Sequence, residues 1–270
     1  MGLTLIVTER FDRHAERIEK ELERRGHTFL RFDLEHFERQ SSGTYSVDGD
    51  GLETLEISGH RIAIDDVDAV WYRRTGQCDL AESYATSERR IARPDCGVFV
   101  QGLWQRLSHA RWVSSPAAIR AASDKFDQVL RAKQCGFSIA DIRAPTGVRQ
   151  PLAPKAYELR ISVFGEQVFA CRILRRERDG TSMDRRAHNW DDPASFPPHE
   201  ATAIPHHLAE SCRLLVRDYG LAYGAIDLVV TPEGEHVFLE LNPNGQWLWI
   251  EERTGLPLGN ALIDVLQRAS

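Results

Sequence analysis

Near its carboxyl end, the chain concentrates oxygen-bearing side chains of the kind that bind divalent cations. Asp227 lies in the apolar run AIDLVV and Glu240 lies in the apolar run VFLEL. Burying two carboxylates close together is costly unless a cation or hydrogen-bond donors compensate them. Asn242 comes two residues after Glu240, so both side chains share one face of a strand. These hard oxygen ligands predict a Mg²⁺ site that holds the phosphates of a nucleotide.

Two strands joined by a turn must position these residues. Residues 222–230 and 236–241 are strongly apolar, and Pro232-Glu233-Gly234 between them predicts a hairpin. Asp227 can then face Glu240 across the ladder. The alternative is that both acids are solvated at strand ends, and the apolar runs around them disfavour it.

The first 115 residues predict a domain that contains a parallel βαβ unit. Its three elements are a strand at Leu3–Thr8, a helix at Phe11–Gly26 and a strand at His27–Phe32. Further along, the patterns predict short antiparallel strands over 45–64, a strand over 69–72, mainly helical structure over about 80–109 and a strand over 112–114.

The remaining residues predict a second group of elements. A helix is expected over Pro116–Gly136 with its cap at Ser123, followed by irregular structure over 138–152. Two strands, 157–164 and 167–175, should form a hairpin around Gly165-Glu166. A long loop over 177–205, a helix over 206–219, the Asp227–Glu240 hairpin and a closing helix over 260–268 complete the chain.

Charge and motif content exclude several classes of protein. The net charge of −6 argues against a nucleic-acid partner, because such proteins need a basic surface. No apolar run is long enough for a membrane span. The motifs of dinucleotide-binding, P-loop and serine-hydrolase sites are also missing. The five cysteines are odd in number and lack CxxC spacing, which predicts reduced thiols in a cytoplasmic protein, with a metal or redox role as the alternative.

Residues 222–258 closely resemble the C-terminal core of ATP-grasp enzymes. The likeness is greatest to the ribosomal-peptide maturases that build microviridin-type graspetides, and it covers nearly the whole chain. Other stretches agree with it: Val70-Trp71-Tyr72-Arg73-Arg74, Trp112-Val113-Ser114-Ser115-Pro116, Ser123-Asp124-Lys125 and Pro154-Lys155-Ala156-Tyr157-Glu158-Leu159-Arg160.

This resemblance implies an α/β (α+β) fold with two domains. Residues 1–115 would form an N-terminal pre-ATP-grasp Rossmann-like domain, and residues 116–270 an ATP-grasp core with an antiparallel sheet. The implied reaction uses ATP and Mg²⁺ to phosphorylate a side-chain carboxylate of a ribosomal precursor peptide, which would bind through its leader and core. A hydroxyl or amine of the same peptide then forms an ester or amide crosslink. A homodimer is a further expectation.

The resemblance also assigns roles to individual residues. It implies that Asp227, Glu240 and Asn242 are metal ligands, and that Arg160 is a catalytic cation on the first core strand that contacts the phosphates. Lys125 and Asn244 would help to bind the nucleotide. The alternatives are a strand-end surface arginine for Arg160 and a helix-surface lysine for Lys125.

The chain departs from the family between the Lys125 helix and the strand at Tyr157. The family carries a lid subdomain there, with a second ATP-binding lysine, a glycine-rich loop and a hinge strand. Only about nineteen residues separate Phe137 from Tyr157, and among them Lys155 is the first lysine. We therefore expect a truncated lid around residues 138–155. Two function classes remain: an active ligase, and a non-catalytic protein that binds a precursor peptide or partners an active ligase.

Other residues admit two interpretations. Arg73-Arg74 follows a strand end, where α/β proteins gather ligands, but a salt-bridged surface pair is as plausible. Trp71, Trp247 and Trp249 could contact a peptide, although large aromatic residues belong more often to the core. His206-His207 is interpreted as the start of a helix rather than as a metal site.

Overall fold

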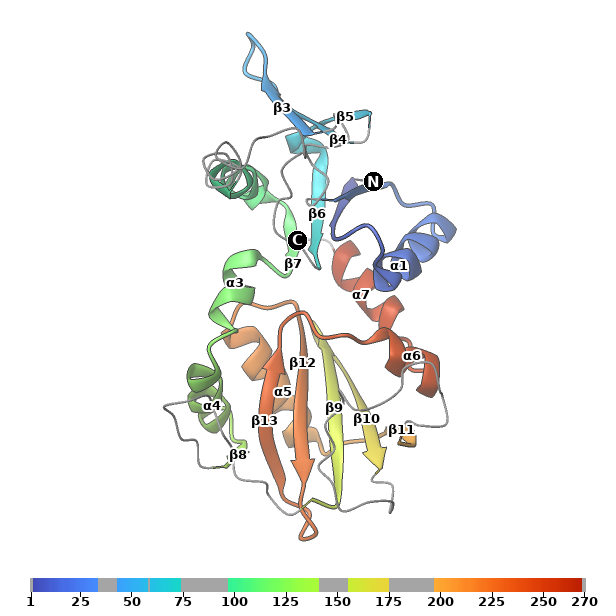
Figure 1. Ribbon diagram of the computed structural model, residues 1–270, viewed down its shortest axis with the longest axis vertical. Helices are drawn as coiled ribbons and strands as arrows, with labels where there is room; N and C mark the ends of the chain where they lie inside the picture. Colours follow the sequence, from blue (N-terminus) through green and yellow to red (C-terminus); the bar gives the residue numbers. More distant parts are fainter. Residues whose placement is uncertain are drawn as a thin grey trace, which may run out of the picture. The chain divides into compact units, whose positions relative to one another are not determined.

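The computed structural model describes residues 2–33, 43–57, 59–73, 97–140, 155–174 and 197–268 (Figure 1). By their internal contacts the residues form two compact units, which are described separately below. The first unit comprises Met1–Pro116 with Gly259–Ser270, and the second comprises Ala117–Leu258.

The first unit contains a parallel sheet that begins with the predicted βαβ arrangement. Strand β1 (Leu3–Val7) pairs in parallel with β2 (Phe29–Phe32), and α1 (Arg13–Arg24) connects them. Beyond β1 lie β6 (Val67–Tyr72) and β7 (Arg111–Val113), which gives the strand order β2-β1-β6-β7 (Figure 1). Ala15, Ile18 and Leu22, whose spacing predicted the helix, are all fully buried.

The antiparallel strands predicted over residues 45–64 are confirmed. They are β3 (Gly43–Val47), β4 (Glu53–Ile57) and β5 (His60–Ala63), which form a separate three-stranded sheet. Two 3-10 turns, at Ile64–Asp66 and Leu107–His109, and a helical segment over 97–106 complete this part of the unit. The predicted helical stretch before residue 97 lies outside the described residues.

The second unit is built on a six-stranded sheet with the order β11-β10-β9-β12-β13-β8. Its central strands are antiparallel, and β8 joins the edge of β13 in parallel. Their bounds are β8 Ser138–Ile139, β9 Tyr157–Phe164, β10 Gln167–Leu174, β11 His199–Thr202, β12 Tyr223–Val230 and β13 His236–Asn242. The mixed α/β class predicted from the sequence is thus confirmed.

Helices cover one face of this sheet and create the core of the unit. Helices α4 (Lys125–Gln134) and α5 (His206–Asp218) pack on it, and α3 (Pro116–Ala121) precedes α4 (Figure 1). The apolar cluster beneath them takes alternate residues of the central strands, such as Leu159 and Ile161 of β9. The opposite side chains of those strands face away from this core and carry the predicted site.

Several local predictions were wrong in detail. The cap of α4 is Asp124, whose carboxylate accepts from the backbone N–H groups of Phe126 and Asp127, whereas the Ser123 hydroxyl donates to Ile119 O. A carboxylate is the stronger acceptor at a helix start, where the backbone donors carry partial positive charge. Strand β11 lies within the predicted long loop. Helix α6 (Leu248–Thr254) was not anticipated, and α7 spans Leu258–Gln267.

Some predictions fall on residues that the structure does not describe. They are the truncated lid over most of 138–155, the side chain of Arg74, and Cys78 and Cys96. Among the described cysteines, Cys171 and Cys212 are buried thiols, and burial raises the pKa of Cys212. None of the described helices combines the length and apolar character that a membrane span requires.

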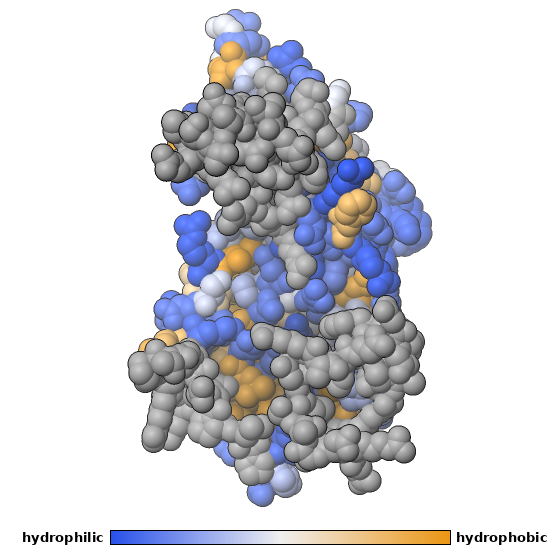
Figure 2. Space-filling model, in the orientation of Figure 1, coloured by the Kyte–Doolittle hydropathy of each residue, from blue (hydrophilic) through white to orange (hydrophobic). Residues whose placement is uncertain are grey.

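Polar residues dominate the described surface that faces the viewer in Figure 2, with smaller apolar areas between them. The large apolar side chains that remain exposed come from both units, and two of them share helix α4: Phe11, Val47, Leu52, Val98, Phe126, Leu130 and Leu214.

Candidate functional site

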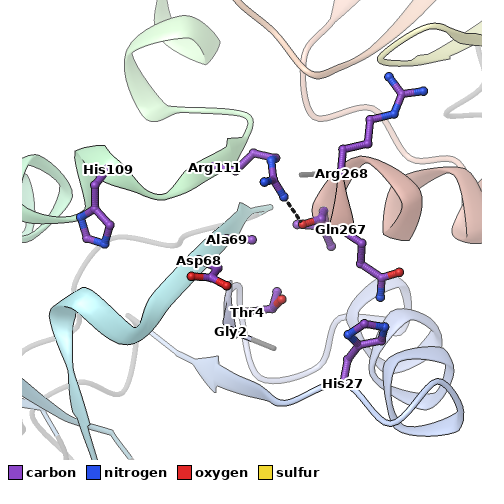
Figure 3. Close-up of a pocket in the computed structure, with 10 residues that line it drawn as sticks. Gly2, Thr4, His27, Asp68, Ala69, His109, Arg111, Gln267 and Arg268 are labelled. Carbon is purple, nitrogen blue, oxygen red and sulfur yellow. Dashed lines mark hydrogen bonds between the residues drawn. The ribbon is translucent and has the colours of Figure 1, made fainter. Parts of the chain in front are cut away.

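A cavity of about 420 Å³ lies in the first unit, away from the residues that the sequence singled out (Figure 3). It is lined by the amino ends of β1, β6 and β7, with charged side chains of both signs such as Asp68 and Arg111. The Arg111 guanidinium donates to Leu266 O at 2.6 Å, which ties α7 to this edge. Ligands of open α/β sheets usually bind at the carboxyl ends of the strands, so this cavity, at the amino ends, is not where a ligand is expected.

The residues predicted to do chemistry meet on the second unit's sheet. Asp227 of β12 pairs directly with Arg160 of β9 on one side and with Glu240 of β13 on the other. Residues directly opposite each other in antiparallel strands point to the same face. The next set along the strands, Ser162, Ala225 and Asn242, therefore shares that face. The expectation that Asp227 faces Glu240 across the ladder is confirmed.

A β-bulge in β13 makes this arrangement possible. Leu228 pairs with Phe238 and Asp227 pairs with Glu240, so Leu239 is an extra residue in β13. Phe238 is fully buried in the core, and strict alternation would place Glu240 on the same face as Phe238. The extra residue reverses the alternation, so that Leu241 enters the core and Glu240 faces the other side.

Arg160 and Asp227 form a buried ion pair at the centre of this face. Only 4% of Arg160 and 6% of Asp227 is exposed, and Nη1 of the arginine donates to Oδ2 of the aspartate. Burial by itself would lower the pKa of the guanidinium, but the nearby negative charges, Asp227 foremost and Glu240 among them, raise it overall. The alternative of a surface arginine is therefore wrong.

Two buried polar atoms on this face have no hydrogen-bond partner among the described residues. They are Nε of Arg160 and Oγ of Ser162, two residues apart on β9. The Nη2 atom of Arg160 makes one long contact, 3.5 Å to Gln246 O. Buried donors are satisfied in most folded proteins, so unmet ones at a polar face favour a bound water or ligand oxygen there.

Lys125 contacts the same group of charges from α4. Its Nζ lies 2.8 Å from Oε2 of Glu240, and about 40% of each side chain is exposed. Lys125 is the first residue of the helix, so the Asp124 cap fixes where its side chain starts. The site thus combines two carboxylates with two side-chain cations on adjoining elements.

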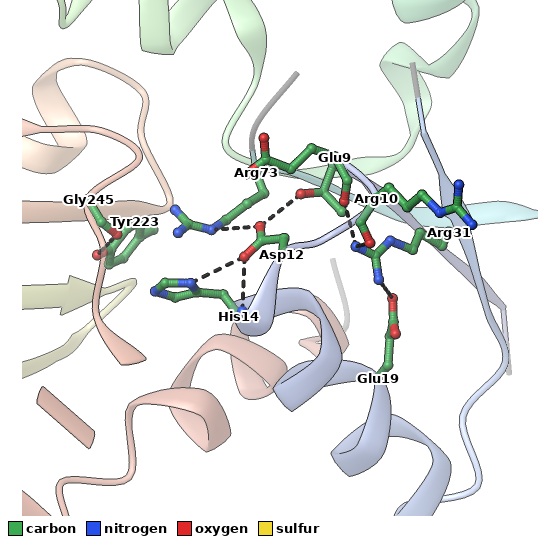
Figure 4. Close-up of polar contacts among 10 residues, drawn as sticks. Glu9, Arg10, Asp12, His14, Glu19, Arg31, Arg73, Tyr223 and Gly245 are labelled. Carbon is green, nitrogen blue, oxygen red and sulfur yellow. Dashed lines mark hydrogen bonds and ion pairs between the residues drawn. The ribbon is translucent and has the colours of Figure 1, made fainter. Parts of the chain in front are cut away.

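The loop after β13 closes against this face. The Tyr223 hydroxyl donates to Gly245 O at 2.8 Å (Figure 4), and Tyr223 itself stacks on Phe164. The backbone N–H of Asn244 donates to Oδ1 of Asn242 at 3.2 Å, which gives the loop a tight turn. These contacts fix the loop after β13 and hold the backbone of Asn244 next to Asn242.

Position 245 requires glycine because there is no room for a Cβ atom, and not because of its backbone dihedral angles. A Cβ atom there would lie 2.5 Å from Ala225 Cβ and 2.9 Å from Arg160 Nη2. We expect Gly245→Ala to cost about 1–3 kcal/mol of unfolding free energy by overpacking. It should also displace the Arg160 guanidinium, whose Nη2 atom lies too close to the added Cβ. Gly102→Ala, where nothing lies within 4 Å, is the control in urea unfolding; equal effects of the two changes would contradict the prediction.

The tryptophans belong mainly to the core. Trp71 and Trp247 are almost fully buried, while Trp249 is partly buried and packs edge-on against His199, with ring centroids 5.0 Å apart. In the described part of the chain, no group of three or more His, Cys, Asp or Glu side chains could hold a metal ion. The candidate metal-binding set on the second unit's sheet does not belong to that class, because it has two carboxylates and one amide.

A second buried polar cluster lies at the carboxyl ends of β1 and β6 in the first unit (Figure 4). Asp12 accepts from the Thr8 hydroxyl and the His14 backbone, and its carboxylate lies 3.3 Å from Nε of Arg73. Arg73 is only 2% exposed. The interpretation of Arg73 as a surface residue is therefore wrong, and the structure places it in this ionic cluster.

This cluster makes the first unit sensitive to acid. Burial would raise the pKa of Asp12, but hydrogen bonds from His14 and Thr8 and the charge of Arg73 lower it well below its ordinary value of 3.8. The resulting stability is present above pH 3.8 and is lost as the pH falls. The loss should reach about 1.4 kcal/mol per pH unit for this group.

We expect Asp12→Asn to lower the stability at neutral pH and to remove this part of the acid dependence. Urea unfolding between pH 7 and pH 2 measures the difference between wild type and variant. A difference that stays constant as the pH falls would contradict the prediction.

Comparisons with known proteins agree with this architecture. Residues 3–120 match the family described as the MvdD pre-ATP grasp domain. The macrocyclase MdnC of Microcystis aeruginosa MRC, solved with the precursor peptide MdnA, is 22% identical with a TM-score of 0.81, over 99% of this chain and 100% of that one. A RiPP-associated ATP-grasp ligase of Chryseobacterium gregarium was solved in complex with ADP and a leader and core peptide. It is 21% identical with a TM-score of 0.83, and the match covers 98% of this chain and 96% of that one.

The ligase PsnB, complexed with a minimal precursor, Mg and ADP, is 18% identical with a TM-score of 0.72, over 98% of this chain and 97% of that one. None of the curated proteins compared with this chain is significantly similar in sequence. The predicted resemblance to ATP-grasp enzymes that act on ribosomal peptides is confirmed, and the fold is theirs.

Proposed function

We propose that this chain, which has the fold of RiPP-associated ATP-grasp ligases and resembles them in sequence, is an ATP-dependent ligase acting on a ribosomal precursor peptide. It would activate a side-chain carboxylate of the peptide for an ester or amide crosslink within that peptide. The observation that carries the proposal is the row Arg160–Asp227–Glu240 across three strands, with Lys125 joined to its end.

The residues present fit a Mg²⁺ ion. Asp227, Glu240 and Asn242 share one face and offer two carboxylates and an amide oxygen, which are the ligands that Mg²⁺ takes in nucleotide sites. An ion held by these residues would supply positive charge that neutralises the charge developing on the phosphate. Asn244, held beside Asn242 by the turn, is proposed to contribute to nucleotide binding.

The charges of the site are complementary to those of a Mg–nucleotide complex. Without a ligand, the two carboxylates are balanced by Arg160 and Lys125. When the carboxylates bind a divalent cation, their side-chain partners become available to phosphate oxygens, the anions they prefer. The Nε atom of Arg160, which has no hydrogen-bond partner among the described residues, supports this proposed contact with a phosphate oxygen.

The proposed reaction has two balanced steps. A carboxylate oxygen of the peptide bonds to the γ-phosphorus of ATP, the bond to the bridging β-phosphate oxygen breaks, and ADP leaves. A hydroxyl or amine of the same peptide then attacks the acyl carbon, loses its proton and expels inorganic phosphate. In both steps negative charge gathers on phosphate oxygens, and Arg160 is placed to stabilise it in a site of low dielectric.

A non-catalytic role is the second candidate. Only nineteen residues separate Phe137 from Tyr157, which favours a truncated lid. A lid excludes water and supplies part of the phosphate contacts, so nucleotide binding without it would be weak and ligation slow or absent. The chain would then bind a precursor peptide or partner an active ligase.

Calorimetry with Mg–ATP, combined with a single-turnover assay on a candidate precursor peptide, separates these functions. The ligase proposal predicts saturable binding of Mg–ATP and a product lighter than the peptide by one water per crosslink. Peptide binding without nucleotide binding or mass loss would favour the non-catalytic role, and no binding of either ligand would contradict both.

A further inference from the structure

The side chain of Gln128 occupies the place of a neighbouring strand at the edge of β13. Its Nε2 donates to Leu241 O at 2.8 Å, and its Oε1 accepts from the backbone N–H of Leu241 at 3.0 Å. The same Nε2 donates to Ala122 O at 2.5 Å. These contacts use both amide donors and the acceptor of a side chain that is 1% exposed.

This contact is needed because β8 is too short to cover β13. Strand β8 ends at Ile139, which pairs with Phe238, and none of the described strands pairs with β13 on that side beside Leu241. Leu241 is fully buried, and its backbone groups would otherwise be desolvated without partners. Gln128 satisfies both groups in the way that a peptide unit of another strand would.

The contact also fixes two sides of the site at once. Leu241 lies between Glu240 and Asn242, so holding its backbone sets the direction of both candidate metal ligands. Gln128 is one turn after Lys125 on the same face of α4, so the contact also sets how Lys125 reaches Glu240. We propose that Gln128 is a positioning residue that holds Lys125, Glu240 and Asn242 in register for Mg–nucleotide binding.

The inference about Gln128 rests on the proposed function, and the experiment distinguishes a failure of the inference from a failure of the proposed function. The change Gln128→Met keeps the length of the side chain and removes its amide. The matched control is Gln134→Met, the same change on the same helix at an exposed position. If Gln128→Met does not fold, Gln128→Glu replaces it, because a carboxyl group keeps an acceptor for the Leu241 N–H and cannot donate to both Leu241 O and Ala122 O.

Two measurements are made well below the unfolding temperature. Calorimetry gives the affinity for Mg–ADP, which we expect to weaken roughly 10- to 100-fold in Gln128→Met, as for other residues that orient metal ligands. The second measurement needs no nucleotide. The chain has four lysines, so the Nζ resonances of ¹⁵N-lysine-labelled protein can be assigned by Lys→Arg changes. The Lys125 resonance should move toward that of a solvated lysine in Gln128→Met and stay in Gln134→Met.

Each outcome decides a separate point. Weaker Mg–ADP binding with a displaced Lys125 resonance, in Gln128→Met alone, supports the positioning role. Wild-type affinity in a folded Gln128→Met variant overturns it, because a purely structural residue would change stability and leave the affinity unchanged. If the wild type binds no Mg–ADP, the proposed function fails, and an unmoved Lys125 resonance would then overturn the positioning of Lys125 as well.

Discussion

Replacing Arg160 with methionine is expected to destabilise the second unit by about 3–5 kcal/mol, because it removes the positive charge that compensates the buried Asp227 carboxylate. Asp227 is 6% exposed, so water cannot replace the guanidinium without opening the sheet. Urea unfolding measures the effect, and hydrogen exchange of β9 and β12 assigns it to this unit. Arg217→Met, at an exposed position of α5, is the control and should change stability by less than about 0.5 kcal/mol.

A second change distinguishes the lost charge from lost packing. The double variant Arg160→Met with Asp227→Leu removes both charges and should recover much of the stability, since buried ion pairs are often replaceable by apolar side chains. It should bind no Mg–nucleotide. An Arg160→Met variant as stable as the wild type, or a double variant no more stable than Arg160→Met, would contradict the central role of this pair.

The change Glu240→Gln should have the opposite profile, with activity lost and stability kept. Glu240 and Lys125 are each about 40% exposed, so their ion pair contributes under about 1 kcal/mol. As a candidate metal ligand, however, Glu240 should affect Mg–ATP-dependent ligation by about 10²–10³-fold, the range for removing one group that stabilises developing charge.

Single-turnover ligation and urea unfolding, made on the same preparations, check this prediction. Glu233→Gln, in the exposed turn between β12 and β13, is the matched control and should leave both quantities unchanged. A Glu240→Gln variant that ligates at the wild-type rate would remove Glu240 from the metal site. A large loss of stability would mean that its role is structural.

The hairpin that carries the site could be predicted from the sequence. The apolar runs around Asp227 and Glu240 predicted both strands. The two-residue spacing of Glu240 and Asn242 predicted that their side chains share one face. Arg160 was correctly placed on the first core strand. These successes share a cause, because buried strands leave a strong local pattern of apolar residues.

Features that depend on tertiary contacts could not be predicted in this way. The bulge at Leu239 had one available signal, since Phe238 and Leu241 are apolar at a spacing of three rather than two. The direct pairing of Arg160 with Asp227 depends on strand order, which sequence periodicity does not give. The amide of Gln128 has no local signature, because an amphipathic helix tolerates a single polar residue on its inner face.

The charged residues differ in their roles because some are buried and others are exposed. The sequence suggested burial only for the acidic residues. Arg160 and Arg73 were both open to a surface interpretation, and both are almost fully buried beside a carboxylate. Lys125 remains half exposed although it belongs to the same site as Arg160. The fold around a cation decides whether it is buried, so residue type alone could not predict which of these three cations would be buried.

The described edges of the six-stranded sheet are short, and this has a consequence for expression and storage. One edge strand, β11, has four residues, and the other, β8, has two. Long unpaired edges are templates on which further chains can add strands and aggregate. Beside β8, the backbone of Leu241 is already occupied by the Gln128 amide. Within the described residues, an incoming chain therefore finds little exposed backbone beside Leu241, which disfavours the addition of a further strand there.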